Sequence, residues 1–136
     1  MAGYSGTPLL KKLGIKPGHQ LRTVNEPQAY WDWLAPLPEA AELNQKPDKV
    51  GLNFIHLFVK GKKEFKKEFL KNKKFLKKDG MLWVSWPKKS AKVPTDLDEN
   101  IIRNFGLENG LVDVKVCAVD ETWSGLKFVF RLRDRN

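Results

Sequence analysis

Cysteine and histidine are both scarce in this chain, and their scarcity limits the metal and redox chemistry open to it. The sequence has one cysteine, Cys117, which excludes an internal disulfide and any cysteine-rich zinc site. The two histidines, His19 and His56, are too few and too far apart in the sequence to suggest a histidine metal cluster. We therefore expect no metal site, an inert buried thiol at Cys117, and a hydrogen-bonded core residue at His56.

Long apolar runs are also missing. No stretch approaches the ~20 apolar residues that a membrane-spanning helix needs, and the start, Met1–Gly6, has no apolar signal core. A chain of 136 residues, 41% of them hydrophobic, can form one domain with a substantial core. We therefore expect a single domain over residues 1–136, located in the cytoplasm.

Glycine is absent from the turn after the first expected strand, where it would be needed to hold a nucleotide cofactor. The first expected strand, 19–24, is followed by the turn 25–29, and no glycine occurs between Gly18 and Gly51. A turn that holds a nucleotide cofactor uses glycines so that backbone amides can approach the ligand. Pro27 removes one amide from this turn altogether. We therefore expect the chain to bind no cofactor.

Positive charge is what the chain has in excess, and it is concentrated in one segment. The net charge is +9, and ten lysines against two glutamates give the segment from Lys60 to Lys78 a net charge of +8. The protein is therefore a near-neutral domain that carries one strongly basic segment.

The hydrophobic pattern predicts strands that alternate with helices. Val50–Val59 is the clearest strand, because its run of apolar residues is typical of a central parallel strand covered on both sides. Asp79 and Gly80 are expected to form a turn before the next strand. In the strand 112–118 the apolar residues alternate and share one face. The expected strands are 19–24, 40–43, 50–59, 81–86, 112–118 and 126–132, and the expected helices are 8–13, 27–34, 61–77 and 95–105.

The helix 95–105 has the strongest end signals. Two overlapping capping boxes, Thr95 with Asp98 and Asp96 with Glu99, are expected to begin it, and a glycine follows its last apolar residue. Together the elements predict an α/β fold, a three-layer sandwich whose mostly parallel sheet is closed by an antiparallel C-terminal hairpin.

The order of elements resembles the end of the class I methyltransferase architecture. The segment 77–85 (KKDGMLWVS) is similar to the penultimate helix end, glycine turn and fifth strand of that fold. The segments 2–15 (AGYSGTPLLKKLGI), 82–89 (LWVSWPKK) and 112–128 (VDVKVCAVDETWSGLKF) resemble a family of small uncharacterised bacterial proteins, a domain of unknown function. The resemblance implies a trimmed, methyltransferase-like Rossmann-type fold without at least one strand-helix unit, and it brings no established activity.

A ligand site is expected beyond the carboxyl ends of the strands, near the switch in strand order. The loops gathered there combine aromatic side chains with a few charges, as small-molecule pockets do. The candidate ligand-binding residues are Asn25, Glu26, Trp86, Lys88, Lys89, Asp120, Glu121, Trp123 and Ser124. Each also has a structural alternative: the tryptophans in packing, the lysines in solvent, and the carboxylates as caps of backbone amides. No catalytic residue is assigned.

The basic segment is a second candidate site. Its apolar residues fall on one helix face, with lysines elsewhere, which is typical of a solvated helix face, a phosphate-binding surface or a helix on an anionic membrane. The candidate polyanion-binding residues are Lys62, Lys63, Lys66, Lys67, Lys73 and Lys74.

These patterns favour one function and leave two alternatives open. The first is a non-catalytic Rossmann-like binding or interaction module, which keeps the sheet and loses the cofactor turn. The second is an enzyme of unknown reaction that uses the strand-end cleft. The third is non-specific binding of nucleic acid or another polyanion. The expected partner is therefore an anionic ligand or nucleic acid, and the final hairpin could also serve as an edge for a homodimer.

Overall fold

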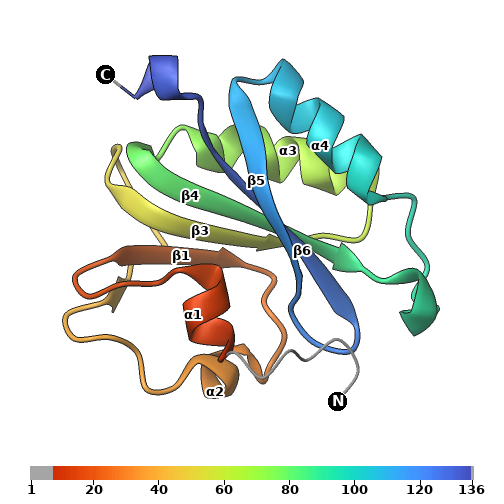
Figure 1. The fold of residues 1–136 in the computed structure, drawn as a ribbon, viewed down its shortest axis with the longest axis horizontal. Coiled ribbons are helices and arrows are strands. Elements are labelled where there is room, and N and C mark those ends of the chain that lie inside the picture. The colour runs from red at the N-terminus through yellow and green to blue at the C-terminus, as the bar shows by residue number, and fades with distance from the viewer. Residues whose placement is uncertain (1–7, 136) are drawn as a thin grey trace.

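The computed structural model describes residues 8–135, which form one six-stranded sheet with helices on both faces (Figure 1). The strands are β1 (Gln20–Val24), β2 (Glu42–Leu43), β3 (Leu52–Phe58), β4 (Leu76–Pro87), β5 (Leu111–Ala118) and β6 (Trp123–Phe130). The helices are α1 (Leu9–Leu13), α2 (Tyr30–Leu34), α3 (Lys62–Lys73) and α4 (Glu99–Glu108), with 3-10 turns η1 (Lys89–Ala91) and η2 (Leu132–Asp134).

The sheet has the order β2-β1-β3-β4-β6-β5. The first four of these strands are parallel neighbours, and β6 runs antiparallel to both β4 and β5. The prediction of a three-layer sandwich with a mostly parallel sheet and an antiparallel closing hairpin is confirmed. Within residues 8–135, no helix is both long enough and apolar enough to cross a membrane.

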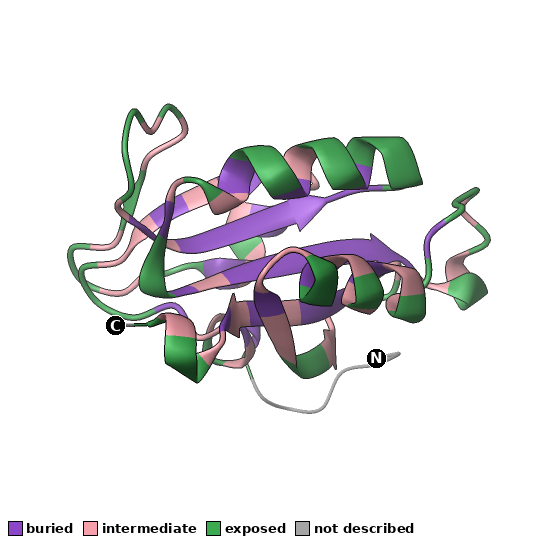
Figure 2. Ribbon diagram, turned by 90° about the horizontal axis from the view of Figure 1, so that it is seen from above, coloured by how far each residue is buried: buried purple, intermediate pink, exposed green. Residues whose placement is uncertain are grey.

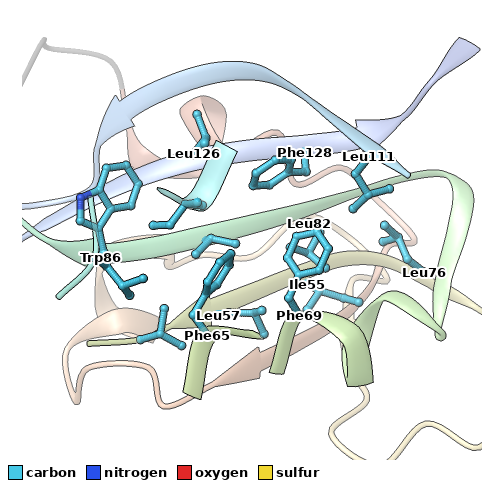
Figure 3. Packing of buried hydrophobic residues seen from close by; sticks show 14 of the residues in the cluster. Ile55, Leu57, Phe65, Phe69, Leu76, Leu82, Trp86, Leu111, Leu126 and Phe128 are labelled. Atoms are coloured by element: carbon cyan, nitrogen blue, oxygen red, sulfur yellow. The ribbon is translucent and has the colours of Figure 1, made fainter. Parts of the chain in front are cut away.

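β3 joins the two halves of the core because its side chains alternate between the faces of the sheet. Ile55 and Leu57 pack in the cluster that α3 and α4 cover (Figure 3). Phe54 and Phe58 pack in the opposite cluster, which α1 and α2 cover. Figure 2 shows the consequence: the central strands are buried, and the helices expose their outer faces. The predicted central strand is thus covered on both sides.

α3 is shorter, and β4 longer, than the sequence predicts. The expected helix 61–77 gives way to β4 at Leu76, so Asp79 and Gly80 lie in a strand and do not form the expected turn. Leu76 is 2% exposed and pairs with Leu52 of β3, so burial in the sheet outweighs the helical pattern of the lysines. Gly80 permits this pairing, since a Cβ there would lie 3.0 Å from the carbonyl oxygen of Leu52.

α4 begins later than the expected helix 95–105. Its N-cap is Asp98, whose side chain accepts a hydrogen bond from the amide of Ile101 at 2.8 Å. The two expected capping boxes, which would begin the helix at Thr95 or Asp96, are therefore wrong. Those two side chains bind the connection between β3 and α3 instead.

The glycine expected to end this helix lies inside it. Gly106 is buried, and the helix continues to Glu108. A Cβ on Gly106 would lie 2.1 Å from the ring of Phe128 in β6. Gly106 therefore allows α4 to approach the sheet closely. The sequence pattern, a glycine after an apolar residue, does not reveal this role.

β5 departs from the alternation that its sequence predicts. Val114 and Val116 are 55% and 52% exposed, because β5 is an edge strand and its pairing with β6 shifts between Asp113 and Lys115. The shared apolar face is therefore not a core face. Leu132 is also exposed, since β6 ends two residues before it.

Candidate functional site: the strand-end cleft

An open cleft of about 410 Å³ lies beyond the carboxyl ends of β1 and β3. In the sheet, β2 lies on one side of β1 and β3 lies on the other side. The strand order therefore reverses between β1 and β3. Open α/β sheets bind ligands at such switch points, and the volume lies within the ~300–1,000 Å³ of small-molecule sites. The residues that line the cleft are Asn25, Pro27, Phe58, Lys60, Glu64 and Trp123.

The turn after β1 forms one wall and bends without a glycine. Asn25 has a φ of 57°, in the left-handed region that asparagine tolerates better than most residues. Its side-chain amide donates a hydrogen bond to the Glu64 carboxylate across the cleft, at 3.3 Å. Glu26, the next residue, accepts a hydrogen bond from the indole N–H of Trp31 at 3.3 Å. The side chains of Asn25 and Glu26 are therefore both held in place by partners.

The start of α3 forms the opposite wall, and its backbone amides are already bonded. The Lys60 amide donates to the Glu64 carboxylate at 3.3 Å, and the Lys62 amide donates to the Asp96 carboxylate at 2.7 Å. The hydroxyl of Thr95 donates to the carbonyl oxygen of Lys60 at 2.6 Å. The loop before α4 therefore fixes this wall, and Glu64 is the carboxylate that faces the cleft.

Two aromatic rings supply the apolar part of the cleft. Phe58, the last residue of β3, is 2% exposed, and its ring lies edge-on to that of the half-buried Trp123, with ring centroids 5.0 Å apart. The Asp120 carboxylate accepts hydrogen bonds from the amides of Thr122 and Trp123, at 2.9 and 2.7 Å. The tight turn between β5 and β6 thereby sets the position of Trp123.

Of the sequence-predicted ligand residues, Asn25 and Trp123 line this cleft. Glu26 lies in the same turn as Asn25, and Asp120 supports Trp123 through its amide. Ser124 pairs with Trp86 in the sheet.

The other predicted ligand residues lie elsewhere. Trp86 is 6% exposed and belongs to the core cluster under α3 and α4, so its ring is not available to the cleft (Figure 3). The Lys88 amide donates to the carbonyl oxygen of Thr122 at 2.8 Å, while Lys89 and Glu121 are exposed. Packing of Trp86 against helices that are distant in sequence decides its direction, and the strand-end rule does not predict it.

Four lining residues, Pro27, Phe58, Lys60 and Glu64, were not among the predicted candidates. Pro27 and Phe58 belong to segments assigned to turn and core, and Glu64 to a helix face. Glu64 does carry a sequence signal: it is the third residue of α3, where an acidic side chain reaches back to the preceding backbone, as in a capping box.

The predicted polyanion residues lie along α3. Lys62, Lys63, Lys66, Lys67 and Lys74 are exposed, and Lys73 is half-buried. The Lys73 ammonium donates to the carbonyl oxygen of Asn109 at the end of α4.

A buried polar chain lies on the other face of the sheet from α3. His56 is fully buried; its Nδ1 lies 2.8 Å from the Tyr30 hydroxyl and its Nε2 lies 2.7 Å from the Ser85 hydroxyl. Burial lowers the pKa of His56 to about 3 and raises that of Tyr30 well above its ordinary value. The prediction of a hydrogen-bonded core histidine is confirmed. Cys117 is only partly buried, and burial raises the pKa of its thiol.

No protein-family model matches the chain, and no functionally curated protein matches it. Solved structures with the same fold include a SAM dependent methyltransferase from Aquifex aeolicus, with a TM-score of 0.60 and 14% identity over 90% of this chain and 88% of that chain. The ribosomal protein L11 methylase from Lactobacillus delbrueckii subsp. bulgaricus has a TM-score of 0.55 and 11% identity, over 90% and 75% of the two chains. Fibrillarin from Aeropyrum pernix, with natively bound S-adenosyl-L-methionine, has a TM-score of 0.58 and 11% identity, over 93% and 70%.

These structures contradict the interpretation of the chain as a non-catalytic module. That interpretation rested on the missing glycines of one turn, whereas the whole sheet and its helices match structures of methylating enzymes. The fold of this chain is methyltransferase-like.

Proposed function

We propose that this chain is a methyltransferase-like enzyme that binds S-adenosylmethionine in the strand-end cleft. The observation that carries the proposal is the position of the cleft, at the switch point of a methyltransferase-like sheet, with two aromatic rings and a carboxylate in its walls. The fibrillarin structure with the same fold holds this compound.

The lining residues fit the chemical groups of S-adenosylmethionine. Phe58 and Trp123 offer apolar ring surfaces for an adenine base or for a sulfonium cation. Glu64 offers a carboxylate for an ammonium group or for sugar hydroxyls, and Lys60 offers an ammonium for a carboxylate. When bound, the compound supplies an electrophilic methyl group.

The turn after β1 fits in a different way from a glycine-rich turn. Asn25 adopts the left-handed bend that a glycine would supply, and its side-chain amide can donate and accept in place of free backbone amides. Pro27 adds an apolar surface to the same wall. The turn therefore binds through side chains, and the open side of the cleft is where the methyl acceptor would enter.

We also propose that the chain belongs with the small bacterial proteins of unknown function that its sequence blocks resemble. The block 112–128 supports this, because it contributes β5, the turn at Asp120 and Trp123 of the cleft wall. A function located in the cleft would then be shared by that family.

Isothermal titration calorimetry with S-adenosylmethionine and S-adenosylhomocysteine tests the proposal. We expect binding of both, weakened about tenfold, or ~1.4 kcal/mol, by Glu64→Gln, which removes the charge that faces the cleft. Glu108→Gln, an exposed position on α4, is the matched control and should bind as the wild type does. Absence of binding by the folded wild-type protein at millimolar ligand would refute the proposal.

A further inference from the structure

Ligand binding in the cleft does not explain the high positive charge of the basic segment, Lys60–Lys78. Seven lysines lie between Lys62 and Lys74, and within residues 8–135 none of them forms a salt bridge; the salt bridges found there join Arg103 to Glu99 and Asp113. Like charges this close repel one another. A surface of this kind is stabilised by an anionic partner.

The two carboxylates of α3 do not neutralise this surface, because they face β1. Glu64 binds Asn25, and Glu68 accepts a hydrogen bond from the Asn72 amide at 3.1 Å. Asn72 in turn accepts from the Arg22 guanidinium of β1 at 2.6 Å. These three α3 residues, spaced by four, form one stripe along the helix. The outward stripe of Lys63, Lys67 and Lys71 is therefore free of acidic side chains.

The positive surface continues beyond the helix into β4. Lys77 and Lys78 are exposed, and the Lys78 ammonium lies 4.3 Å from the ring centroid of Phe130. Burial, followed by the nearby charge of Lys78, lowers the pKa of Lys73. Cations are thus crowded at the end of α3 as well as along it.

The burial of α3 distinguishes between the possible anionic partners. A helix that binds a membrane surface inserts a free apolar face into the lipid. The apolar face of α3 is not free, because Phe65 and Phe69 are both fully buried between the helix and the sheet. Leu70, 45% exposed, is the large apolar side chain that α3 leaves open. A charged surface without an apolar face suits a solvated phosphate chain better than a bilayer.

We propose that the outward face of α3, extended by the start of β4, binds the phosphate backbone of nucleic acid. The 12 residues of α3 extend for about 18 Å at ~1.5 Å per residue, a length that faces about five phosphates of one strand of B-DNA at ~3.4 Å each. Lysine neutralises phosphates as a point charge, and the segment has no arginine to read guanine. Binding is therefore independent of sequence and steeply dependent on salt.

Fluorescence anisotropy with a labelled single-stranded RNA and with a duplex DNA, over a salt titration from ~50 mM, tests the proposal. The variant Lys63→Gln/Lys67→Gln/Lys71→Gln removes the outward stripe. The variant Lys11→Gln/Lys46→Gln/Lys49→Gln loses the same charge from exposed positions elsewhere. Circular dichroism melting checks that both variants are folded.

We expect the wild type and the control variant to bind, and the α3 variant to bind more weakly at every salt concentration. Its slope of log affinity against log salt should fall by about 2 for single strands and about 3 for duplex DNA, following three lost phosphate contacts. Equal loss in the two variants would overturn the proposal. Failure of the wild type to bind either nucleic acid at ~50 mM salt would also overturn it. The same holds if, in a parallel assay, the wild type binds phosphatidylserine vesicles but no nucleic acid.

Discussion

The hydroxyl of Tyr30 and the Nδ1 atom of His56 lie 2.8 Å apart in the buried layer between the sheet and α2. The other ring nitrogen of His56 lies 2.7 Å from the Ser85 hydroxyl. A neutral imidazole satisfies both contacts, because one of its nitrogens donates and the other accepts. This chain of hydrogen bonds thus joins α2, β3 and β4, and burial favours the uncharged form of the histidine within it.

Acidification is expected to destabilise the protein through His56. Its pKa is about 3 in the folded state, against an ordinary value of 6.5. The unfolded state therefore binds the proton first, so this contribution to stability is complete above pH 6.5 and is lost as the pH falls toward 3. The slope is about 1.4 kcal/mol per pH unit. Urea unfolding at several pH values between these limits measures it.

The variant His56→Gln should be less stable at neutral pH and should lose less stability on acidification than the wild type. His19→Gln is the matched control, because His19 is only partly buried, and it should keep most of the acid dependence of the wild type. An unchanged acid dependence in His56→Gln would show that other groups carry it.

Gly106→Ala is expected to destabilise the fold strongly. The new Cβ would meet the ring of Phe128 at 2.1 Å, and overpacking of this kind typically costs ~1–3 kcal/mol or more. Gly51→Ala, where no atom lies within 4 Å of the added Cβ, should be nearly neutral. Thermal unfolding of the two variants compares them, and equal melting temperatures would contradict the close approach of α4 to β6.

Asp98→Ala is expected to destabilise the protein by about 1 kcal/mol, the usual cost of a lost N-cap, because it removes the acceptor for the Ile101 amide. Asp98→Asn keeps an acceptor oxygen and should restore most of the stability. Chemical denaturation measures both. If the asparagine variant were as unstable as the alanine variant, hydrogen bonding at the cap would not be the cause.

Asp120→Ala is expected to weaken binding of S-adenosylhomocysteine while leaving the fold intact. The Asp120 carboxylate holds the amides of Thr122 and Trp123, so its loss should free Trp123 and reduce affinity about tenfold, or ~1.4 kcal/mol. Asp120→Asn keeps the single oxygen, Oδ1, that accepts both of these bonds and loses only the charge, so its affinity should lie between those of Asp120→Ala and the wild type. Calorimetry gives the affinities, and an unchanged affinity in Asp120→Ala would mean that this turn does not position the ring for binding.

Local periodicity was sufficient to predict the layers of the fold, since the apolar run of β3 required cover on both faces. It failed at Leu76 and at Val114, where sheet pairing and an edge position override the pattern. For the cleft, the strand-end rule named Asn25 and Trp123, and both residues line it. It could not show that Trp86 turns into the core, because that depends on helices packed from elsewhere in the chain.

Ligand titration followed by nuclear magnetic resonance tests the central claim most directly. With ¹⁵N-labelled protein and S-adenosylhomocysteine, we predict shifts of the Asn25 and Trp123 signals. The indole N–H of Trp83, which donates to the carbonyl oxygen of Leu13 at 2.9 Å inside the core, should not shift. Shifts confined to residues outside the cleft, or no shift at millimolar ligand, would contradict the account.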